Sequence, residues 1–449
     1  MKKEKKKLLY DVHETPPFLK WMVLAIQHVF AMFGATILVP ILVNEMAGAE
    51  VLTIPMALFA SGVGTLIYII CTKKKSPVYL GSSFAFIAPI VAGYAVAGRE
   101  GVFTALAAVG LVYVIIALII KFTSKNWVDK LLPPIVVGPM IMIIGLSLSG
   151  SAIGNIGIAA DSVFQISNIV VALVTFLVTI IVSMYTKGFM KVIPFLVGII
   201  AGYITAICFG MVDFTAIKEA GFFEIPKFYI MFKDYMPNFG AMLTIVPVAL
   251  VTIAEHIGDH TALSNILGRD LLKDPGLDNS LLGDGIATGV AAMIGGPANT
   301  TYGENTSVVG MTKVASVKVL GTAAIFAIII AFLGKVTAII GSIPSPVIGG
   351  VSILLYGFIA VNGLKVLVQK QIDFGKTKNV VIAATMLVIG LGNAVINITS
   401  GNFALAISGM SLAAILGIIL NLILPEEKDE EDIVEEVKEQ KIKKASKKK

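Results

Sequence analysis

The sequence predicts an all-α polytopic membrane protein with 14 transmembrane segments, arranged as an inverted repeat of seven plus seven. Composition is the first indication, because 56% of the 449 residues are hydrophobic and only 14% are charged. Soluble domains carry about 25% charged residues. The mean hydropathy is +0.89. The other two indications are the spacing of long apolar runs and the recurrence of short motifs between the two halves.

Apolar runs of about 17 to 25 residues can cross the hydrocarbon core as helices. Ten such runs occur at 21–43, 51–71, 102–120, 169–185, 192–209, 242–263, 317–340, 347–366, 380–395 and 403–424. Four further runs are shorter or interrupted, at 84–96, 135–148, 281–294 and directly after Glu304. We predict that the third and tenth segments are broken into half-helices. Irregular backbone at membrane depth survives only where it is paired or lines a cavity, so these two segments should hold short antiparallel strands that pair with each other.

Lysine and arginine gather in alternate loops, which the positive-inside rule places in the cytoplasm. They lie at 2–7, 73–75, 121–130, 187–191, 269–273, 313–318, 365–378 and in the C-terminal tail. The opposite loops 149–168, 341–346 and 397–402 contain neither residue. Both termini are therefore predicted to be cytoplasmic in a multi-pass protein of the cell membrane. The net charge of +6 comes from lysines and arginines in these loops and at the chain ends, so it indicates membrane orientation. It does not indicate a nucleic-acid partner, and none is expected.

Two segments depart from this charge pattern. Arg99 falls on the outer side, and the aromatic-rich loop 212–239 also carries lysines, so we expect that loop at the outer membrane interface. Residues 426–449 are acidic and then Lys-rich, which predicts a disordered cytoplasmic extension.

The two halves of the chain share motifs. Three residues of the fifth segment recur in the twelfth at a constant offset of 212: Pro134, Gly138 and Gly145 match Pro346, Gly350 and Gly357. The triplet 27–29 resembles 255–257, and 77–83 resembles 297–305. Seven segments per half is an odd number, so the second copy enters the membrane from the opposite side. Interrupted segments at matching places in both halves indicate a transporter binding site.

Ionisable side chains concentrate in 254–312, inside segments that otherwise predict membrane helices. A charge there costs roughly 2.5 to 3.5 kcal/mol even on insertion scales, so such groups usually face a cavity and serve function. Glu255 and Asp259 share one helix face at i and i+4, with His256 and His260 on the neighbouring face. Two carboxylates at close range in low dielectric rarely both ionise, so one is expected to hold a proton. This arrangement suits proton coupling, although either histidine could instead be a packing residue.

The second motif, 297–303, is poor helix material, so we expect helix to resume near Glu304. The free N–H groups at that new N-terminus would point into the site with partial positive charge. Residues 81–84 offer the same donors from the other half. A planar cyclic imide or amide needs this mixture, because carboxylates accept from its ring N–H groups while backbone N–H groups donate to its carbonyls.

These motifs resemble those of the nucleobase/ascorbate transporter family, the nucleobase:cation symporters, and most closely its bacterial uracil permeases. The resemblance covers nearly all of the chain except the tails, and the Asn-Thr-Thr-Tyr-Gly-Glu-Asn run at 299–305 is highly specific. The other stretches that carry it are 27–28, 30–36, 79–86, 254–256, 269–270 and 274–277.

The resemblance implies a core domain of segments one to four and eight to eleven, and a gate domain of segments five to seven and twelve to fourteen. The implied boundaries are a cytoplasmic tail at 1–19, core parts at 20–125 and 241–341, gate parts at 126–211 and 342–425, an extracellular loop at 212–240 and a tail at 426–449. A homodimer is left open.

The resemblance also implies a secondary active transporter that imports uracil by proton symport and alternating access. The residues that would hold uracil are Glu255 and Glu304, the main-chain N–H groups of Phe84 and Gly303, and Tyr302 and Ser83 beside them. The proton would be carried by Glu255, Asp259, His256 and His260. Supporting residues would be Gln27, His28 and Asn305. The implied partners are uracil or a related nucleobase, protons and the lipid bilayer, with no cofactor and no metal.

Two positions depart from the family's uracil permeases. Asp259 stands where the best-known members have histidine and purine-transporting relatives often have aspartate, and Ser307 stands where the family has glycine. A purine permease for xanthine or uric acid therefore stays an alternative, as does sodium in place of protons. A metal-ion transporter is more distant, since His256, His260 and Asp259 could share zinc. No nucleophile elbow or His-Glu-x-x-His motif appears, so an enzyme is not expected.

Overall fold

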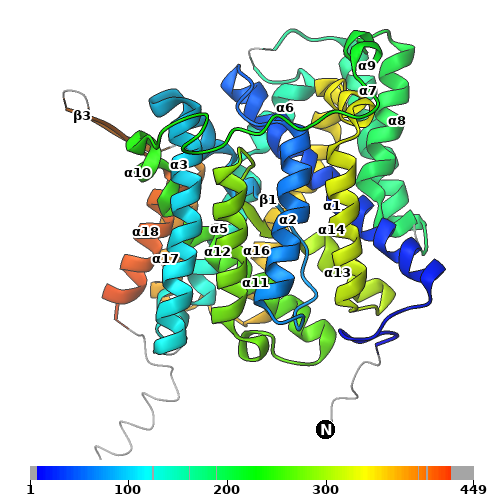
Figure 1. Ribbon diagram of the computed structural model, residues 1–449. Coiled ribbons are helices and arrows are strands. Elements are labelled where there is room, and N and C mark those ends of the chain that lie inside the picture. The colour runs from blue at the N-terminus through cyan, green and yellow to red at the C-terminus, as the bar shows by residue number, and fades with distance from the viewer. Residues whose placement is uncertain are drawn as a thin grey trace, which may run out of the picture.

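The computed structural model describes residues 8–123, 126–160, 162–188, 190–392, 394–400 and 403–425, most of them helical (Figure 1). The longer helices are α1 (Phe18–Ala47), α2 (Ile54–Cys71), α3 (Ile87–Phe122), α5 (Pro134–Ser147), α7 (Ile166–Tyr185), α8 (Pro194–Cys208), α11 (Ala249–Leu267), α12 (Leu277–Met293), α13 (Gly303–Thr312), α14 (Val317–Ala331), α16 (Ser345–Gln369), α17 (Thr377–Leu391) and α18 (Gly409–Ile423). Shorter elements are α4 (Asn126–Leu131), α6 (Ser149–Ile156), α9 (Thr215–Glu219), α10 (Met242–Ile245), α15 (Gly334–Gly341), η1 (Phe84–Phe86), η2 (Met190–Val192), η3 (Phe239–Ala241), η4 (Val246–Val248) and η5 (Leu272–Gly276). The strands are β1 (Leu80–Ser82), β2 (Asn299–Thr301), β3 (Val395–Ser400) and β4 (Phe403–Ser408).

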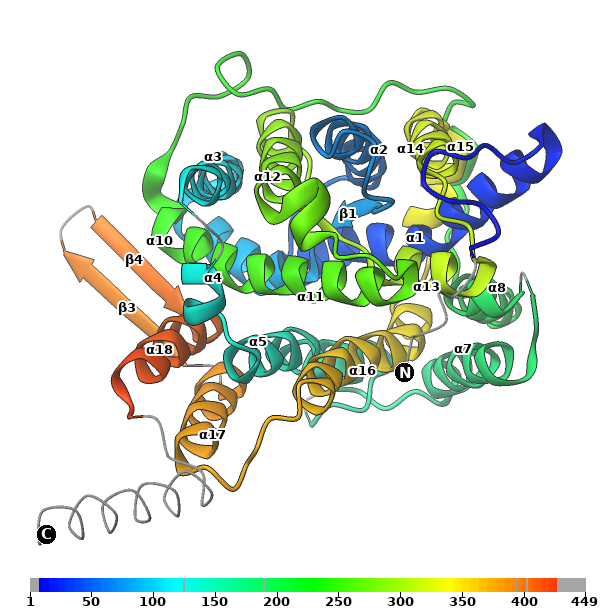
Figure 2. The same cartoon turned by 90° about the horizontal axis from the view of Figure 1, so that it is seen from below.

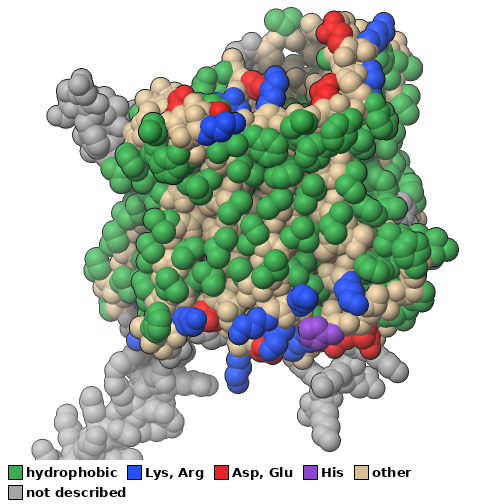
Figure 3. Space-filling view, in the orientation of Figure 1, with side chains coloured by type: hydrophobic (Ala, Val, Ile, Leu, Met, Phe, Trp, Pro, Cys, Tyr) green, Lys and Arg blue, Asp and Glu red, His purple; other side chains and the backbone are tan. Residues whose placement is uncertain are grey.

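Long apolar helices make the chain a multi-pass membrane protein. Within the described residues, seven helical stretches are long and apolar enough to cross a bilayer, or eight if Val317–Ala331 and Gly334–Gly341, bent by 82°, form one span. Shorter apolar helices are α8, α17 and α18. Figure 3 shows the matching surface, a broad apolar band with charged side chains along its upper and lower edges. The count of 14 segments and the inverted repeat stay predictions.

A glycine interrupts the helix where the predicted third and fourth segments meet. The predicted runs 84–96 and 102–120 lie in one stretch, Phe84–Phe122, of 39 residues. Gly98 breaks it with φ 67° and ψ −169°, a conformation that residues with a Cβ rarely adopt. At about 1.5 Å per residue, a helix of this length is well beyond a hydrocarbon core of about 30 Å. The stretch is therefore long enough for both predicted segments.

The helices form two groups, with α11 along the boundary between them (Figure 2). In the first helix group, α12 packs against α2 and α3, α14 packs against α1 and α2, and α13 packs against α1 and α11. In the second helix group, α16 packs against α5, α6, α7 and α8, and α17 packs against α5 and α18. Contacts of α11 with α5 and of α1 with α8 join the groups. Each half of the chain contributes helices to both groups.

A short antiparallel strand pair lies inside the first helix group, which confirms the prediction for the two broken segments. β1 pairs with β2, with Gly81 opposite Thr300. The pair is held to α2, where Thr65 Oγ1 accepts from the Leu80 N–H at 2.9 Å. Glycine is required at position 81, because a Cβ there would lie 2.3 Å from the ring of Tyr302. The strands lead directly into η1 and α13, so they fix the positions of both helix N-termini.

A second strand pair corrects the prediction near the C-terminal end. β3 and β4 pair antiparallel, where the sequence analysis placed an outer loop at 397–402 and the start of a helix at Phe403. Helix α18 instead begins at Gly409. Valine, isoleucine and threonine favour extended backbone, and a short apolar run cannot by itself be assigned to helix or strand. The prediction that a membrane helix runs from residue 403 is therefore wrong for its first six residues.

The N-terminal segment is bonded to the body of the protein. The sequence analysis predicts a cytoplasmic tail at 1–19, and the Leu9 N–H in this segment donates to the Lys313 carbonyl at 2.7 Å. Further backbone bonds join this segment to the connection between α13 and α14. Residues 1–7 and the predicted extension at 426–449 lie outside the described residues.

Candidate functional site

Glu255 and Asp259 lie on the face of α11 that is turned toward β2. Thr300 Oγ1 donates to Glu255 Oε2 at 3.2 Å, and Thr301 Oγ1 donates to Asp259 Oδ2 at 2.5 Å. Both acidic side chains remain partly exposed. The prediction that they share one helix face is confirmed, and the strand holds each carboxylate through one of its two oxygens.

His256 and His260 lie on the other face of α11 and are fully buried. His256 Nδ1 lies 2.9 Å from Asp284 Oδ2, and its Nε2 lies 2.9 Å from Ser280 Oγ, both on α12. His260 Nδ1 lies 2.8 Å from the His256 carbonyl, and its Nε2 lies 2.5 Å from Tyr68 Oη on α2. The two rings stack with centroids 4.1 Å apart. All four ring nitrogens thus have partners inside the first helix group.

In the described part of the chain, no three His, Cys, Asp or Glu side chains are arranged to hold a metal ion.

Asp284 is a buried acid that the sequence analysis did not identify. It lies in α12 and is fully buried. Its Oδ2 faces His256, whereas its Oδ1 has no hydrogen-bond partner among the described residues. An ionisable residue within the apolar run 281–294 was the available signal, because such residues in membrane segments usually serve function. It extends the polar cluster from α11 into α12.

Glu304 lies in the first turn of α13, which begins at Gly303 after the extended residue Tyr302. The prediction that helix resumes near Glu304 is confirmed. The first N–H groups of a helix have no carbonyl partner within it, and anionic or acceptor groups are favoured there. A Cβ on Gly303 would lie 3.7 Å from Asp259 Oδ1. The start of α13 therefore lies against the carboxylates of α11, and Glu304 itself is partly exposed.

Ser83 and Phe84 present the equivalent N-terminus from the first half of the chain. The Ser83 N–H donates to the Ala298 carbonyl at 3.0 Å, and its buried Oγ has no partner among the residues that the structure describes. Phe84 begins η1, so its N–H has no acceptor within that turn. Its ring lies edge-on to Tyr356 of α16, with centroids 6.2 Å apart. Tyr356, which the sequence analysis did not identify, thus brings the second helix group to the site.

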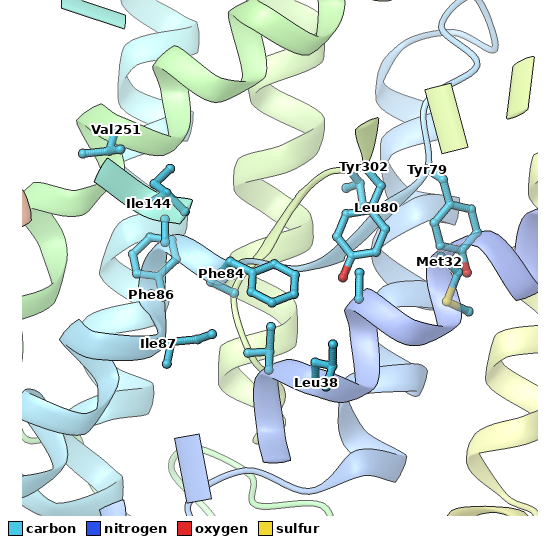
Figure 4. Packing of buried hydrophobic residues seen from close by; sticks show 14 of the residues in the cluster. Met32, Leu38, Tyr79, Leu80, Phe84, Phe86, Ile87, Ile144, Val251 and Tyr302 are labelled. Atoms are coloured by element: carbon cyan, nitrogen blue, oxygen red, sulfur yellow. The ribbon is translucent and has the colours of Figure 1, made fainter. Parts of the chain in front are cut away.

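The side chain of Tyr302 braces the strands. Its Oη donates to the Ser82 carbonyl at 3.0 Å and accepts from Thr36 Oγ1 of α1 at 3.2 Å. Its ring is buried against Gly81, and Figure 4 shows it in the same apolar cluster as Phe84. The phenol therefore joins α1, β1 and β2, and its backbone leads into the start of α13.

The predicted supporting residues join α1 to α13. Asn305 Nδ2 donates to the His28 carbonyl at 3.0 Å and lies 3.1 Å from His28 Nδ1. Gln27, His28 and Asn305 are all buried. The bonds of Asn305 hold the first turn of α13 in place, and Gln27 lies beside them on α1.

A cavity of about 730 Å³ lies between α11 and the second helix group. Its walls include Gly258, Thr261 and Asn265 from α11 and Asp129, Val137 and Lys370 from the opposite group. Neither Glu255 nor Glu304 lines it, but Gly258 is the residue before Asp259. The cavity therefore lies between α11 and the end of α16 near Lys370, and the proposed substrate residues are not part of its wall.

Comparison with known proteins finds a permease family, in agreement with the resemblance of the sequence motifs. The sequence profile Xan_ur_permease, described as Permease family, matches residues 19–399. The chain is 48% identical to a uracil permease of Bacillus caldolyticus, over 93% of this chain and 95% of that protein. It is 46% identical to a uracil permease of Bacillus subtilis (strain 168), over 95% and 98% of the two chains. It is 40% identical to a uracil permease of Escherichia coli (strain K12), over 92% and 93%.

Solved structures share the fold at low sequence identity. The transmembrane domain of a cyanobacterium bicarbonate transporter, BicA, matches with a TM-score of 0.57 and 14% identity, over 92% of this chain and all of that one. The murine Solute Carrier 26 family member A9 anion transporter in the inward-facing state matches with a TM-score of 0.63 and 13% identity, over 91% and 68% of the two chains. Identities this low describe a common architecture only.

Proposed function

The chain belongs to this permease family, and we propose that it imports uracil across the cell membrane by proton symport with alternating access. Its relatives are transporters and not enzymes, and the Bacillus proteins compared above are named uracil permeases. Similarity over almost the whole length supports the substrate assignment. The site geometry supports a binding mode in which carboxylates and helix N-termini hydrogen-bond to uracil.

The observation that carries the proposal is the meeting of carboxylates with two helix N-termini. Glu255 on α11 and Glu304 on α13 supply carboxylate acceptors. The donors are the backbone N–H groups of Phe84, the first residue of η1, and Gly303, the first residue of α13. Uracil has two ring N–H donors and two carbonyl acceptors. The two carboxylates can accept from its N–H groups, and the two backbone N–H groups can donate to its carbonyls. Ser83, with its unpaired hydroxyl, is a further candidate contact.

Glu255 and Asp259 are the proposed proton carriers. Uracil is neutral, so the membrane potential does not drive it, and accumulation needs a co-transported ion. Thr300 and Thr301 each donate a hydroxyl to one of these carboxylates. A proton on Asp259 would weaken the bond from Thr301, so protonation is linked to the position of β2. His256 and His260, on the other face of α11, are further proposed proton carriers, and His256 contacts the buried Asp284.

The two helix groups supply the proposed moving parts. We assign the first helix group to the core domain and the second helix group to the gate domain, with the predicted boundaries. Lysine and arginine at 269–273 and 365–378 flank the cavity, so it would open to the cytoplasm, where both termini would also lie.

A ligand panel tests the proposed substrate. Purified protein is tested for thermal stabilisation by uracil, thymine, xanthine, hypoxanthine, uric acid and ascorbate. We expect uracil to give the largest shift. Stabilisation by xanthine or uric acid without uracil would favour the purine permease that Asp259 suggests, and no response to any nucleobase would reject the proposal.

A further inference from the structure

The loop between α9 and η3 has an outer surface that uracil transport does not use. Six side chains from this loop and the start of η3 are between 65% and 75% exposed: Phe222, Phe223, Ile225, Phe232, Met236 and Phe239. Met231 and Tyr235 instead turn inward, at 9% and 7% exposed. Large apolar side chains that stay in water lose the stabilisation that burial would give them. The loop therefore has one face packed on the protein and one apolar face that the chain does not cover.

Hydrogen bonds hold this loop against three helices of the first helix group, at the ends of α12 and α14 and beside the kink of α3. The bonds run from the Glu224 N–H to the Phe332 carbonyl beyond α14 (2.9 Å), from the Met231 N–H to the Met293 carbonyl of α12 (2.9 Å) and from Asn238 Nδ2 to the Ala97 carbonyl of α3 (3.1 Å). Figure 1 shows the loop crossing the upper end of the molecule. Figure 2 shows it on the outer rim, on the side away from α5 and α16.

The exposed rings are positioned by local structure. Phe232 has φ 68°, a conformation uncommon for a bulky residue. Its N–H donates to the Tyr235 carbonyl at 2.8 Å, and Asp234 Oδ2 accepts from the Ile230 N–H at 2.8 Å. Bonds on both sides of the turn thus hold the backbone that directs this ring outward.

The position and composition of this surface match a membrane interface. The loop crosses the upper end of the molecule in Figure 1, and in the same orientation Figure 3 shows charged side chains gathered along the upper edge of the apolar band. Exposed lysines accompany the aromatic rings, and exposed acids of the same stretch balance their charge: Lys218, Lys227 and Lys233 against Glu219, Glu224 and Asp234. Aromatic residues concentrate at both lipid–water interfaces, so the rings are the feature that matches the headgroup region.

We propose that this loop surface binds the headgroup region of the outer lipid leaflet and anchors the first helix group there. A lipid surface fits better than a second copy of the chain, because the rings are distributed along a rim over three helices and do not form one compact patch. The three bonds above join the loop to α3, α12 and the end of α14, so the anchor acts on that group. The leaflet assignment rests on the proposed topology, whereas the lipid contact does not depend on the substrate.

Tryptophan scanning in vesicles tests this contact directly. Phe222→Trp, Phe232→Trp and Phe239→Trp variants are reconstituted separately in phosphatidylcholine and phosphatidylglycerol, and the emission of the unsubstituted protein is subtracted. One quencher is a nitroxide on the lipid near the headgroup, and the other is aqueous iodide. Leu177→Trp on the exposed side of α7 is the lipid-facing reference, and Lys370→Trp in the cavity wall is the water-facing reference.

We expect the lipid nitroxide to quench the loop variants several-fold more than Lys370→Trp, and iodide to quench them several-fold less. Full quenching by iodide with none by the lipid label would overturn the proposal. Protection from iodide that appears only at high protein-to-lipid ratio, again without lipid quenching, would mean that a second copy covers the loop and would equally overturn it.

Discussion

Replacing Glu304 with glutamine probes the uracil site at a single atom. The side chain is partly exposed in the first turn of α13, and glutamine has the same shape but exchanges one acceptor oxygen for an N–H donor. That donor would face a ring N–H of uracil. Loss of a charge-assisted hydrogen bond costs about 1.5 to 3 kcal/mol, and because each 1.4 kcal/mol is tenfold, the Kd should rise about 10- to 150-fold.

The measurement is uracil affinity by calorimetry on purified protein, with the melting temperature recorded for each variant. Ser307→Ala is the matched control, because Ser307 is exposed on the same helix and its Oγ donates only to the Gly303 carbonyl, at 2.9 Å. We expect Ser307→Ala to bind uracil like the parent protein. Wild-type affinity in a folded Glu304→Gln protein would remove this residue from the site.

Four other changes test separate parts of the account. Asp259→Asn should leave uracil binding and exchange of labelled for unlabelled uracil largely intact while uphill uptake collapses; equal loss of exchange and uptake would assign Asp259 to binding instead. Asp284→Ala leaves His256 Nδ1 buried without its partner, which should cost about 1 to 3 kcal/mol of stability and lower the melting temperature; an unchanged value would contradict this. Gly81→Ala places a Cβ 2.3 Å from the Tyr302 ring, and overpacking of this kind costs about 1 to 3 kcal/mol, so a stable variant would show that the strand pair can shift. Cysteine labelling should place Lys74 and Lys273 on the same side of the membrane, and opposite sides would refute the topology.

Much of the site could be predicted from the sequence because it depends on local chemistry. The spacing of Glu255 and Asp259 fixes their common helix face, and the Asn-Thr-Thr-Tyr-Gly run at 299–303 cannot continue a helix. At membrane depth no water can pair with the N–H and C=O groups of such backbone, so they must pair with another segment or line a cavity. The strand pair and the start of α13 follow from those constraints alone.

The remaining features depend on contacts between distant segments. Asp284 gains its role from His256 on another helix, and Tyr356 reaches Phe84 across the boundary between the helix groups. The bond from Tyr302 to Thr36 likewise requires α1 beside β1. The β3–β4 pair was missed because apolar runs do not distinguish a strand from a helix over so few residues.

Uracil uptake into proteoliposomes tests the central claim most directly, with an imposed inward proton gradient and no sodium. The account predicts accumulation that disappears when the gradient is collapsed and in Asp259→Asn and Glu255→Gln. Accumulation that appears only with a sodium gradient, or that persists unchanged in both variants, would contradict it.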